Sequence, residues 1–356
     1  MSFMNTKKSH RKIITITVIC SVFYIIFALR PLSTELHMTP EWSQDISRKE
    51  ESHEGDNFIP FRLGQDLGYF TEDGRIVYKT TFPFKASISE KYWTVYGPDN
   101  TSALIYNPDG SEKTRLNAAG FPFIDKDNIF VFLPGGNAFA KYDNNGKELW
   151  RYESYAPITA FSSAGKASAA GFADGSLVSF NEDGKVDQSF FPGGSGTQVI
   201  LGTAVSPDGS LLACLSGLNP QRFVLSEKNE GHSKIIFHEY LEKDCARQVL
   251  VKFNSNSDTV YYNYQGGLGI VNVKSRKSSH VPLQGKIIQI EESSVEKLVF
   301  VLSRNAEKWT VTCLEPFDNI AGNFSFDAEK AFIQVRGNKL FVGKDNKISC
   351  LSISRK

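Results

Sequence analysis

The chain lacks the residue patterns by which most enzymes and metal proteins are recognised. It has no HExxH motif, no GxSxG nucleophile turn, no P-loop and no GxGxxG dinucleotide motif. Its six histidines are scattered, and its five cysteines form no CxxC pair and no other metal-type spacing. We therefore assign no catalytic residue, no metal ligand and no cofactor-binding residue, and we expect a protein that is not an enzyme.

The chain also lacks an excess of charge of one sign and the many cysteines of a protein that disulfides stabilise. Forty Lys and Arg residues face 39 Asp and Glu residues over 356 positions, so the net charge is +1 and no overall field favours nucleic acid as a partner. Five cysteines are few for an exported chain that depends on disulfides. We expect Cys214, Cys245, Cys313 and Cys350 to be buried free thiols.

What is present begins with an uncharged run near the N-terminus. Residues 13–29 are 17 consecutive residues without a charge, which as a helix would cover about 25 Å at ~1.5 Å per residue. Four Lys or Arg residues lie within positions 7–12, and only Arg30 follows the run closely. Because basic flanks stay in the cytoplasm, the pattern predicts cytoplasmic residues 1–12, a transmembrane helix over 13–29 and an exported remainder.

A cleaved signal peptide is the alternative for this run. Signal peptides have a shorter apolar region, about 7–15 residues, and end in a small-x-small cleavage site. Here Arg30 and Pro31 stand where cleavage would need small residues, so we favour an uncleaved anchor. Residues 30–57 are polar with little apolar periodicity, which predicts a tether between the membrane and a folded domain.

The most informative feature is a turn that recurs at a nearly constant interval. An acid or amide that precedes a glycine stands three positions after an aromatic residue at Asp73, Asp109, Asn145 and Asp183, in steps of 36, 36 and 38 residues. Asp-Gly and Asn-Gly pairs supply the positive φ angles of tight hairpins, and the aromatic residue closes the preceding strand. One antiparallel unit, of the length of a propeller blade, is therefore repeated.

From residue 58 onward the pattern indicates strands and turns with almost no helix. Four strand types, from the innermost to the outermost place in a blade, each recur seven times, which predicts an all-β, seven-bladed β-propeller over 58–356. The first outermost strand, 75–82, precedes any innermost strand, so we expect the last strand, 348–353, to pair with it and close the ring. Residues 68–72 are left over, which keeps an eighth, partial blade open.

The turns resemble those of known propeller repeats. Residues 174–177 and 145–152 resemble the quinoprotein-type (PQQ-like) repeat, and residues 206–209 are similar to the turns of WD40-like blades. The resemblance covers about residues 65–215 and implies a fold rather than an activity. Quinone-dependent members hold their cofactor with adjacent cysteines, a stacking tryptophan and calcium. Because adjacent cysteines are missing here, we expect no bound quinone.

Two short segments imitate ligand sites. Residues 193–196 look like a phosphate loop but lack a following lysine and helix, and residues 143–145 are the nearest approach to a calcium loop. Turn formation explains both segments, so neither is assigned as a site.

Aromatic residues next to proline recur at the connections between blades. The run Phe-Pro-Phe occurs at 82–84 and again at 121–123, and 191–192 and 155–157 occupy the same place. Such residues can cap the blade cores, because proline is tolerated at the start of a strand. They can also form an aromatic rim that binds a peptide or protein. On the second interpretation, Phe84, Phe123 and Phe191 are the candidate binding residues.

These observations predict a single-pass protein of the cytoplasmic (inner) membrane with its propeller on the extracytoplasmic, periplasmic side. We expect a non-enzymatic scaffold that binds an envelope protein or peptide, comparable with the propeller subunits of outer-membrane assembly machinery. The alternative is a propeller enzyme, a lyase or hydrolase, with its site in the central channel. Charged side chains converging on the axis would favour the alternative, and loop-borne aromatics without such a cluster would favour the scaffold.

Overall fold

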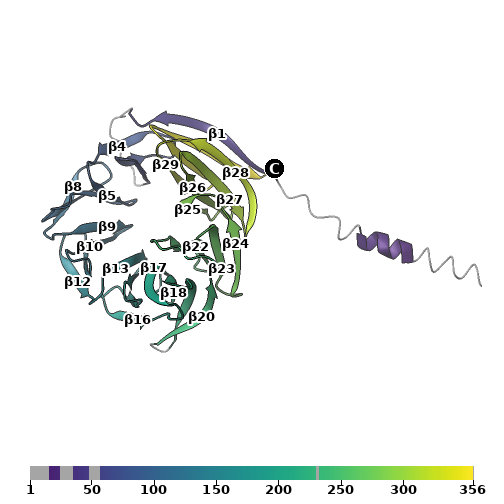
Figure 1. The fold of residues 1–356 in the computed structure, drawn as a ribbon. Coiled ribbons are helices and arrows are strands. Elements are labelled where there is room, and N and C mark those ends of the chain that lie inside the picture. Colours follow the sequence, from purple (N-terminus) through teal and green to yellow (C-terminus); the bar gives the residue numbers. More distant parts are fainter. Residues whose placement is uncertain (1–15, 25–34, 48–56, 230–231, 356) are drawn as a thin grey trace, which may run out of the picture.

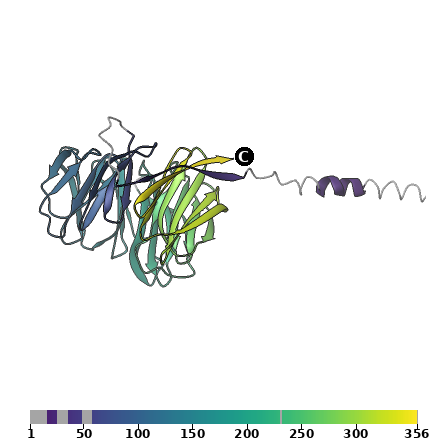
Figure 2. The same cartoon turned by 90° about the horizontal axis from the view of Figure 1, so that it is seen from above.

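The computed structural model of this chain describes residues 16–24, 35–47, 57–229 and 232–355. Apart from one helix over residues 16–24, the regular structure in these ranges is β-strand. The strands form a ring of sheets around a common axis (Figure 1), and Figure 2 shows the same ring from above. The strands therefore make an all-β propeller, as the repeated turns predict.

Eight sheets make up the ring, so the expected count of seven blades is corrected to eight. Blades 1 to 4 contain β2 (Ile59–Leu63), β3 (Asp66–Phe70), β4 (Ile76–Thr81); β5 (Lys85–Ile88), β6 (Trp93–Tyr96), β7 (Ala103–Tyr106), β8 (Glu112–Leu116); β9 (Phe121–Asp125), β10 (Asn128–Phe132), β11 (Ala138–Tyr142), β12 (Glu148–Glu153); and β13 (Ile158–Ala164), β14 (Ala167–Phe172), β15 (Leu177–Phe180), β16 (Val186–Phe190).

The second half of the ring repeats the same order. Blades 5 to 8 contain β17 (Thr197–Val205), β18 (Leu211–Leu218), β19 (Arg222–Asn229), β20 (His232–Tyr240); β21 (Val251–Phe253), β22 (Thr259–Tyr264), β23 (Gly267–Asn272), β24 (Lys277–Pro282); β25 (Lys286–Ser293), β26 (Leu298–Asn305), β27 (Lys308–Glu315), β28 (Asn319–Asp327); and β29 (Ala331–Arg336), β30 (Lys339–Lys344), β31 (Lys347–Arg355), β1 (Leu36–Asp45). The first strands of successive blades contact one another around the axis, as β25 and β29 do.

The miscount arises at blade 1. The residues left over by the sequence pattern, 68–72, lie in β3 and the turn after it, and β2 precedes them. Together with β4 these strands form a blade of their own, for which the described residues supply three strands. β4 is therefore the outermost strand of blade 1 and pairs with β3 rather than with the end of the chain.

The ring is closed by β1, which corrects the predicted partner of the last strand. β1 pairs antiparallel with β31 from Leu36 opposite Arg355 to Asp45 opposite Lys347. Figure 1 shows β1 lying along the outside of the last blade. The two ends of the propeller chain share one sheet, as expected, but the N-terminal partner lies some 40 residues earlier than 75–82, at 36–45. Closure of this kind leaves no open sheet edge at the seam.

β1 also corrects the predicted tether over 30–57. It mixes half-buried and exposed side chains, as the outermost strands β12 and β28 do. Trp42 lies 5.9 Å from Phe341 and 6.4 Å from Phe70 between ring centroids, and Ile46 is buried. The segment reads as polar because an outermost strand packs on one side and meets water on the other. Residues 30–34 and 48–56 of the expected tether lie outside the described residues.

The expected cytoplasmic segment over 1–12 and parts of the expected transmembrane helix over 13–29 also lie outside the described residues. Within them, the helix covers residues 16–24. Across the ranges that the structure describes, we find no helix of the length and apolar character that a membrane crossing requires.

The recurring glycine turns pack closely against the neighbouring blade. At Asp109-Gly110 the glycine N–H donates to Asn107 O at 3.0 Å and its φ is +89°. A Cβ added at Gly110 would lie 2.2 Å from the ring of Tyr78 on the outermost strand of blade 1. Gly184 meets Trp150 in the same way, at 2.4 Å. The turns therefore need glycine for the positive φ and also for the neighbouring aromatic ring.

The core consists of layers between adjacent blades, as the aromatic content suggests. Between blades 3 and 4, Phe139 lies 5.5 Å from Phe180 and 5.6 Å from Trp150, and Phe130 lies 5.0 Å from Phe161. Edge-to-face pairs of this kind add to the burial of apolar area. The four propeller cysteines, named above, are buried thiols.

Candidate functional site

The two sides of the ring carry different kinds of connection. Because the strands of a blade alternate in direction, every link from an outermost strand to the next blade lies on one side, which we call the connection face. The Asp-Gly and Asn-Gly turns that precede the outermost strands, such as 109–110 and 183–184, lie on the opposite side, which we call the turn face. The links at residues 82–84, 117–120, 154–157, 191–196 and 241–250 belong to the connection face.

The exposed aromatic side chains of the propeller gather on the connection face. Within the ranges 35–47, 57–229 and 232–355, five aromatic residues are at least half exposed. Each lies in a link between blades or at the strand end beside one, and together they run from the link between blades 1 and 2 to the last strand of blade 5. We call these residues the aromatic arc: Phe84, Phe121, Tyr155, Phe191 and Tyr240.

Two of the three candidate residues from the sequence belong to the arc. Phe84 and Phe191 are exposed, whereas Phe123 is half-buried and lies 5.6 Å from Phe161 and 6.4 Å from Phe132 between ring centroids. Phe123 therefore packs in the layer between blades 3 and 4. Its neighbour two positions earlier, Phe121, is the exposed member of that Phe-Pro-Phe run. The binding role of all three residues stays a prediction.

The sequence pattern did not select three members of the arc. Phe121 shares its proline-flanked run with Phe123, and Tyr155 stands in a run of the same kind, so their exposure alone distinguishes them. Tyr240 ends β20 without such a run. Only the folded structure identifies Tyr240, because Arg222 of the neighbouring strand lies over its ring.

A buried arginine holds one part of the arc in place. Arg222 Nη1 donates to Pro192 O at 3.0 Å and to Gly193 O at 3.3 Å, and its guanidinium lies 5.5 Å from the centroid of the Tyr240 ring. The link at 191–196 is thus tied to both β19 and β20. A tied link presents Phe191 with less ordering cost on binding than a free loop would. The phosphate-loop-like glycines Gly193 and Gly194 serve here as residues of positive φ.

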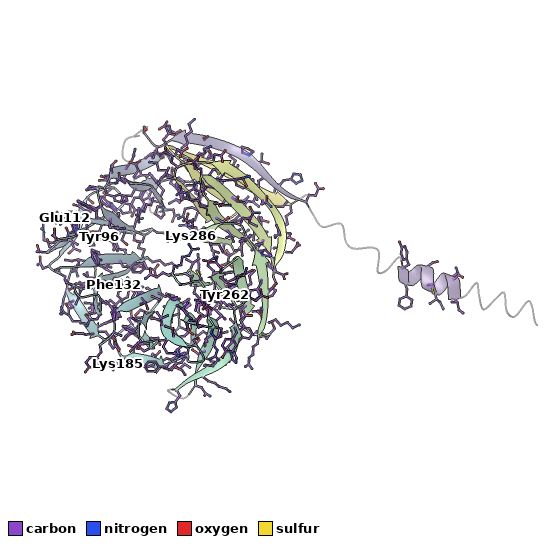
Figure 3. All side chains as sticks on the ribbon, in the orientation of Figure 1. Tyr96, Glu112, Phe132, Lys185, Tyr262 and Lys286 are labelled. Carbon is purple, nitrogen blue, oxygen red and sulfur yellow. The ribbon has the colours of Figure 1, made fainter. Side chains whose placement is uncertain are left out.

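A hollow beside Phe121 adds depth to the connection face. A cavity of about 400 Å³ is lined by Arg62, Tyr96 and Phe121 together with Phe123 and Phe132. The rings of Tyr96 and Phe121 are 5.9 Å apart. In Figure 3, Tyr96 and Phe132 lie inward of Glu112 and Lys185, which mark the perimeter. This volume suits an apolar or aromatic side chain of a partner.

Charged side chains also converge on the axis, near the turn face. They come from the innermost strands or the turns that follow them: Glu90, Asp125, Lys252, Glu291 and Arg336. Arg336 pairs with Glu90 across two blades. Lys252 Nζ donates to Ile290 O at 2.7 Å.

Two carboxyl groups of this axial cluster have a raised pKa. Burial raises the pKa of Asp125 above its usual range, and the nearby charges of Lys126 and Lys252 reduce the effect. Burial likewise raises the pKa of Glu291, against the attraction of Lys252 and Arg336. Carboxyl groups of this kind can hold a proton nearer to neutral pH than exposed ones do, which is the property of a general acid or base.

The segments that imitate ligand sites act as turns. Asp143 Oδ1 accepts hydrogen bonds from Asn145 N at 2.9 Å and Lys147 N at 2.8 Å, so its carboxylate caps its own hairpin. Across the described residues, we find no group of three or more His, Cys, Asp or Glu side chains placed to hold a metal ion.

One protein resembles this chain in sequence, and two solved structures resemble it in fold. A protein of Treponema pallidum (strain Nichols), described as an uncharacterized protein, is 28% identical over 99% of this chain and 96% of its own length. The crystal structure of BamB from Moraxella catarrhalis matches 89% of this chain and 100% of its own with a TM-score of 0.58 and 12% identity. The Cps50 (Swd1) beta-propeller domain of Myceliophteria thermophila matches 74% of this chain and 94% of its own, with a TM-score of 0.51 and 11% identity.

At 11–12% identity the two solved structures establish a common fold and nothing finer. A family model carries the comparison further. The model described as "beta-propeller protein" matches residues 4–356, which is nearly the full length of the sequence. The chain therefore belongs to this beta-propeller protein family.

Proposed function

We propose that the propeller is a non-enzymatic scaffold that binds another protein through its connection face. The observation that carries the proposal is the aromatic arc. Its five members are the exposed aromatic residues of the described propeller, and all lie on one face. Exposed aromatics that share a face are typical of protein interfaces, where a few such residues supply most of the binding energy.

The spread of the arc supports a macromolecular partner rather than a small ligand. Its members run from the link before blade 2 to the last strand of blade 5, so a ligand that touches them all must cover much of one face. A standard protein interface buries about 800 Å² on each partner, an area of that scale. We also propose that the repeat is of the quinoprotein type. The proposal of a macromolecular partner does not depend on the repeat type.

We further propose that residues 13–29 anchor the propeller in the cytoplasmic membrane, with the arc on the extracytoplasmic side. The uncharged run and its basic flank support this proposal. The partner would then be another protein or peptide of the cell envelope. A reporter fused after Lys356 should be active only if it is an export-dependent one. Release of the protein from membranes by alkali, or a mature N-terminus near residue 30, would contradict the anchor.

The binding proposal is tested by crosslinking in native membranes and by recovery of the crosslinked partner. We expect Phe191→Ala and Tyr155→Ala to reduce recovery at least about tenfold when combined, because aromatic anchors can each contribute about 2 kcal/mol. Leu149→Ala is the control, since Leu149 is also an exposed apolar residue but lies on the outermost strand β12. Equal recovery with the arc variant and the control would reject the arc as the interface.

A second candidate function is an enzyme, a lyase or hydrolase, at the axis. The convergence of Asp125, Glu291 and Lys252 favours it, because two carboxyl groups of raised pKa lie near one ammonium group. The test is a hydrolase and lyase substrate screen with the wild type and with Glu291→Gln and Asp125→Asn. A turnover that both variants abolish would establish this function in place of the scaffold.

A further inference from the structure

A second hollow lies on the connection face, between the last blades and the first. Its volume is about 560 Å³, and its walls come from blades 7, 8, 1 and 2. Ile88, Ile288 and Ala331, which are half-buried, supply apolar wall. Arg62 and Ile88 line both this cavity and the smaller one beside Phe121, so the two cavities adjoin. The adjoining cavities form an elongated groove, which we call the arginine groove.

Two arginines that line this groove are held in place but keep free donors. Arg62 Nη1 donates to Ala86 O at 3.3 Å, and its guanidinium lies 5.1 Å from the centroid of the Phe82 ring. Arg304 Nε donates to Ala306 O at 2.7 Å, and its guanidinium lies 5.0 Å from the centroid of the Trp309 ring. An aromatic face and one carbonyl restrict each side chain and leave further N–H groups for a ligand.

The charge of the groove is not balanced by its own walls. In the described part of the chain neither Arg62 nor Arg304 forms an ion pair, whereas Lys330, the third cation of the larger cavity, pairs with Asp66 at 3.4 Å. Glu329 is the one carboxylate among the residues that line that cavity. Two restrained guanidinium groups beside an apolar wall therefore complement a ligand that has both carboxylate and apolar groups.

The backbone beside the groove favours an extended ligand. Leu63 and Asp66 flank the two-residue turn between β2 and β3. Because hydrogen-bonded pairs alternate from such a turn, we infer that Pro60 and Arg62 direct their backbone groups to the other edge of β2. Among the described residues no strand pairs with that edge. Proline lacks an N–H, so the edge offers Arg62 N–H as a donor and the carbonyls of both residues as acceptors.

We propose that the arginine groove binds an extended acidic segment of a partner protein, in which carboxylate and apolar side chains alternate. Side chains of an extended chain alternate between two sides, so apolar residues meet Ile88 and Ile288 while carboxylates reach Arg62 and Arg304. This inference goes beyond the proposed function, because the groove lies apart from most of the aromatic arc. The groove can bind such a segment even where the arc binds nothing.

Fluorescence anisotropy of a labelled peptide of alternating glutamate and leucine, titrated with the full chain, tests the proposal. We expect binding that weakens with added salt, and no binding of the matched lysine-leucine peptide. Arg62→Gln and Arg304→Gln should each reduce affinity about tenfold, because each removes a charge-assisted hydrogen bond. Arg62→Lys keeps the charge but not the fork and should lose part of the affinity. Arg115→Gln, on the outermost strand β8, is the control.

The outcomes separate this proposal from the others. Phe191→Ala should leave the affinity for the peptide unchanged, so failure of the arc and failure of the groove are seen in different variants. Equal affinity of the wild type and the folded double variant Arg62→Gln/Arg304→Gln, checked by melting, would overturn the proposal. Binding that is seen only after Glu50, Glu51, Glu54 and Asp56 are neutralised would also overturn it, because the chain's own acidic residues would then be the ligand.

Discussion

The two faces of the disc are built from the same repeat but differ in their connections: one face has packed glycine turns and the other has exposed aromatic side chains. On the turn face, glycines such as Gly110 and Gly184 lie against aromatic rings of the neighbouring blade, and the turns are closed by their own hydrogen bonds. On the connection face, aromatic side chains such as Phe84 and Phe191 point into solvent. The turn face therefore holds the blades together, and the connection face has apolar surface available for a partner.

The difference follows from where each link can find packing partners. A short hairpin turn of the turn face joins strands of one blade, and the outermost strand of the previous blade lies directly beneath it. A link between blades must cross from the perimeter to the axis, so it rises above the layers and its side chains lose neighbours. The five members of the aromatic arc all lie in or beside such links.

The largest expected effect is a loss of stability of the whole domain, which would affect both faces. A chain that starts at residue 47 lacks β1, so β31 becomes an open edge and Trp42 and Ile46 leave the seam. We expect the whole domain to lose about 5 kcal/mol or more, since each buried large side chain contributes about 2–3 kcal/mol and the ladder is lost as well. Calorimetric melting compared with a chain that starts at residue 35, which keeps β1, measures the effect. Equal melting of the two chains would mean that another strand closes the ring.

The next effect distinguishes an exposed aromatic residue of the connection face from a packed one. Phe123→Ala removes a half-buried ring from the layer between blades 3 and 4 and should cost about 2 kcal/mol of stability. Phe191→Ala removes an exposed ring and should cost less than about 0.5 kcal/mol. Denaturant unfolding of both variants gives the two values. If the order were reversed, Phe191 would be a packing residue and would leave the arc.

A smaller effect tests the tight packing of the turn face. Gly184→Ala introduces a Cβ that collides with Trp150, in addition to the cost of a positive φ, and we expect a loss of about 2 kcal/mol. Gly136→Ala is a matched control on the connection face, where φ is +74° and no atom lies within 4 Å of the added Cβ. It should cost only about 1 kcal/mol. Equal losses would mean that the ring of Trp150 adjusts without cost.

The smallest effect concerns pH and the axial cluster. Because burial raises the folded-state pKa of Asp125 and Glu291, their neutral forms favour folding. Their contribution is fully present below the unfolded pKa values, about 4, and is lost as pH rises through the folded values. Glu291→Gln should therefore melt like the wild type in acid and slightly above it at neutral pH.

Asp66 supplies a control of opposite sign. Burial opposes its ionisation, but Thr81, Lys79 and Lys330 together lower the pKa of Asp66. Its contribution is present above the unfolded pKa and is lost as pH falls through the folded value. Asp66→Asn should thus lower the melting temperature at neutral pH and have little effect in strong acid. A loss that does not change with pH would show that the side chain acts by packing alone.

Much of the architecture could be predicted from local patterns. Asp109-Gly110 and its repeats specify hairpins because positive φ angles are favourable for glycine, and this preference is independent of the rest of the chain. Their regular spacing indicates blades. The candidate site could be predicted only in part: proline-flanked runs select Phe84 and Phe191, which are exposed and whose binding role stays a prediction. Arg62 and Arg304, far apart in the sequence, carry no common motif.

The sequence by itself thus determined the β-rich class, the turns and the repeat. Tertiary structure alone decided which strand closes the ring, because β1 packs on one face only and its polar residues resemble a linker. It also decided that Phe121 is exposed and Phe123 packed, since both stand in one Phe-Pro-Phe run and differ only in the neighbours that blade 4 provides. Exposure and pairing are set by contacts between distant residues, and no local pattern records those contacts.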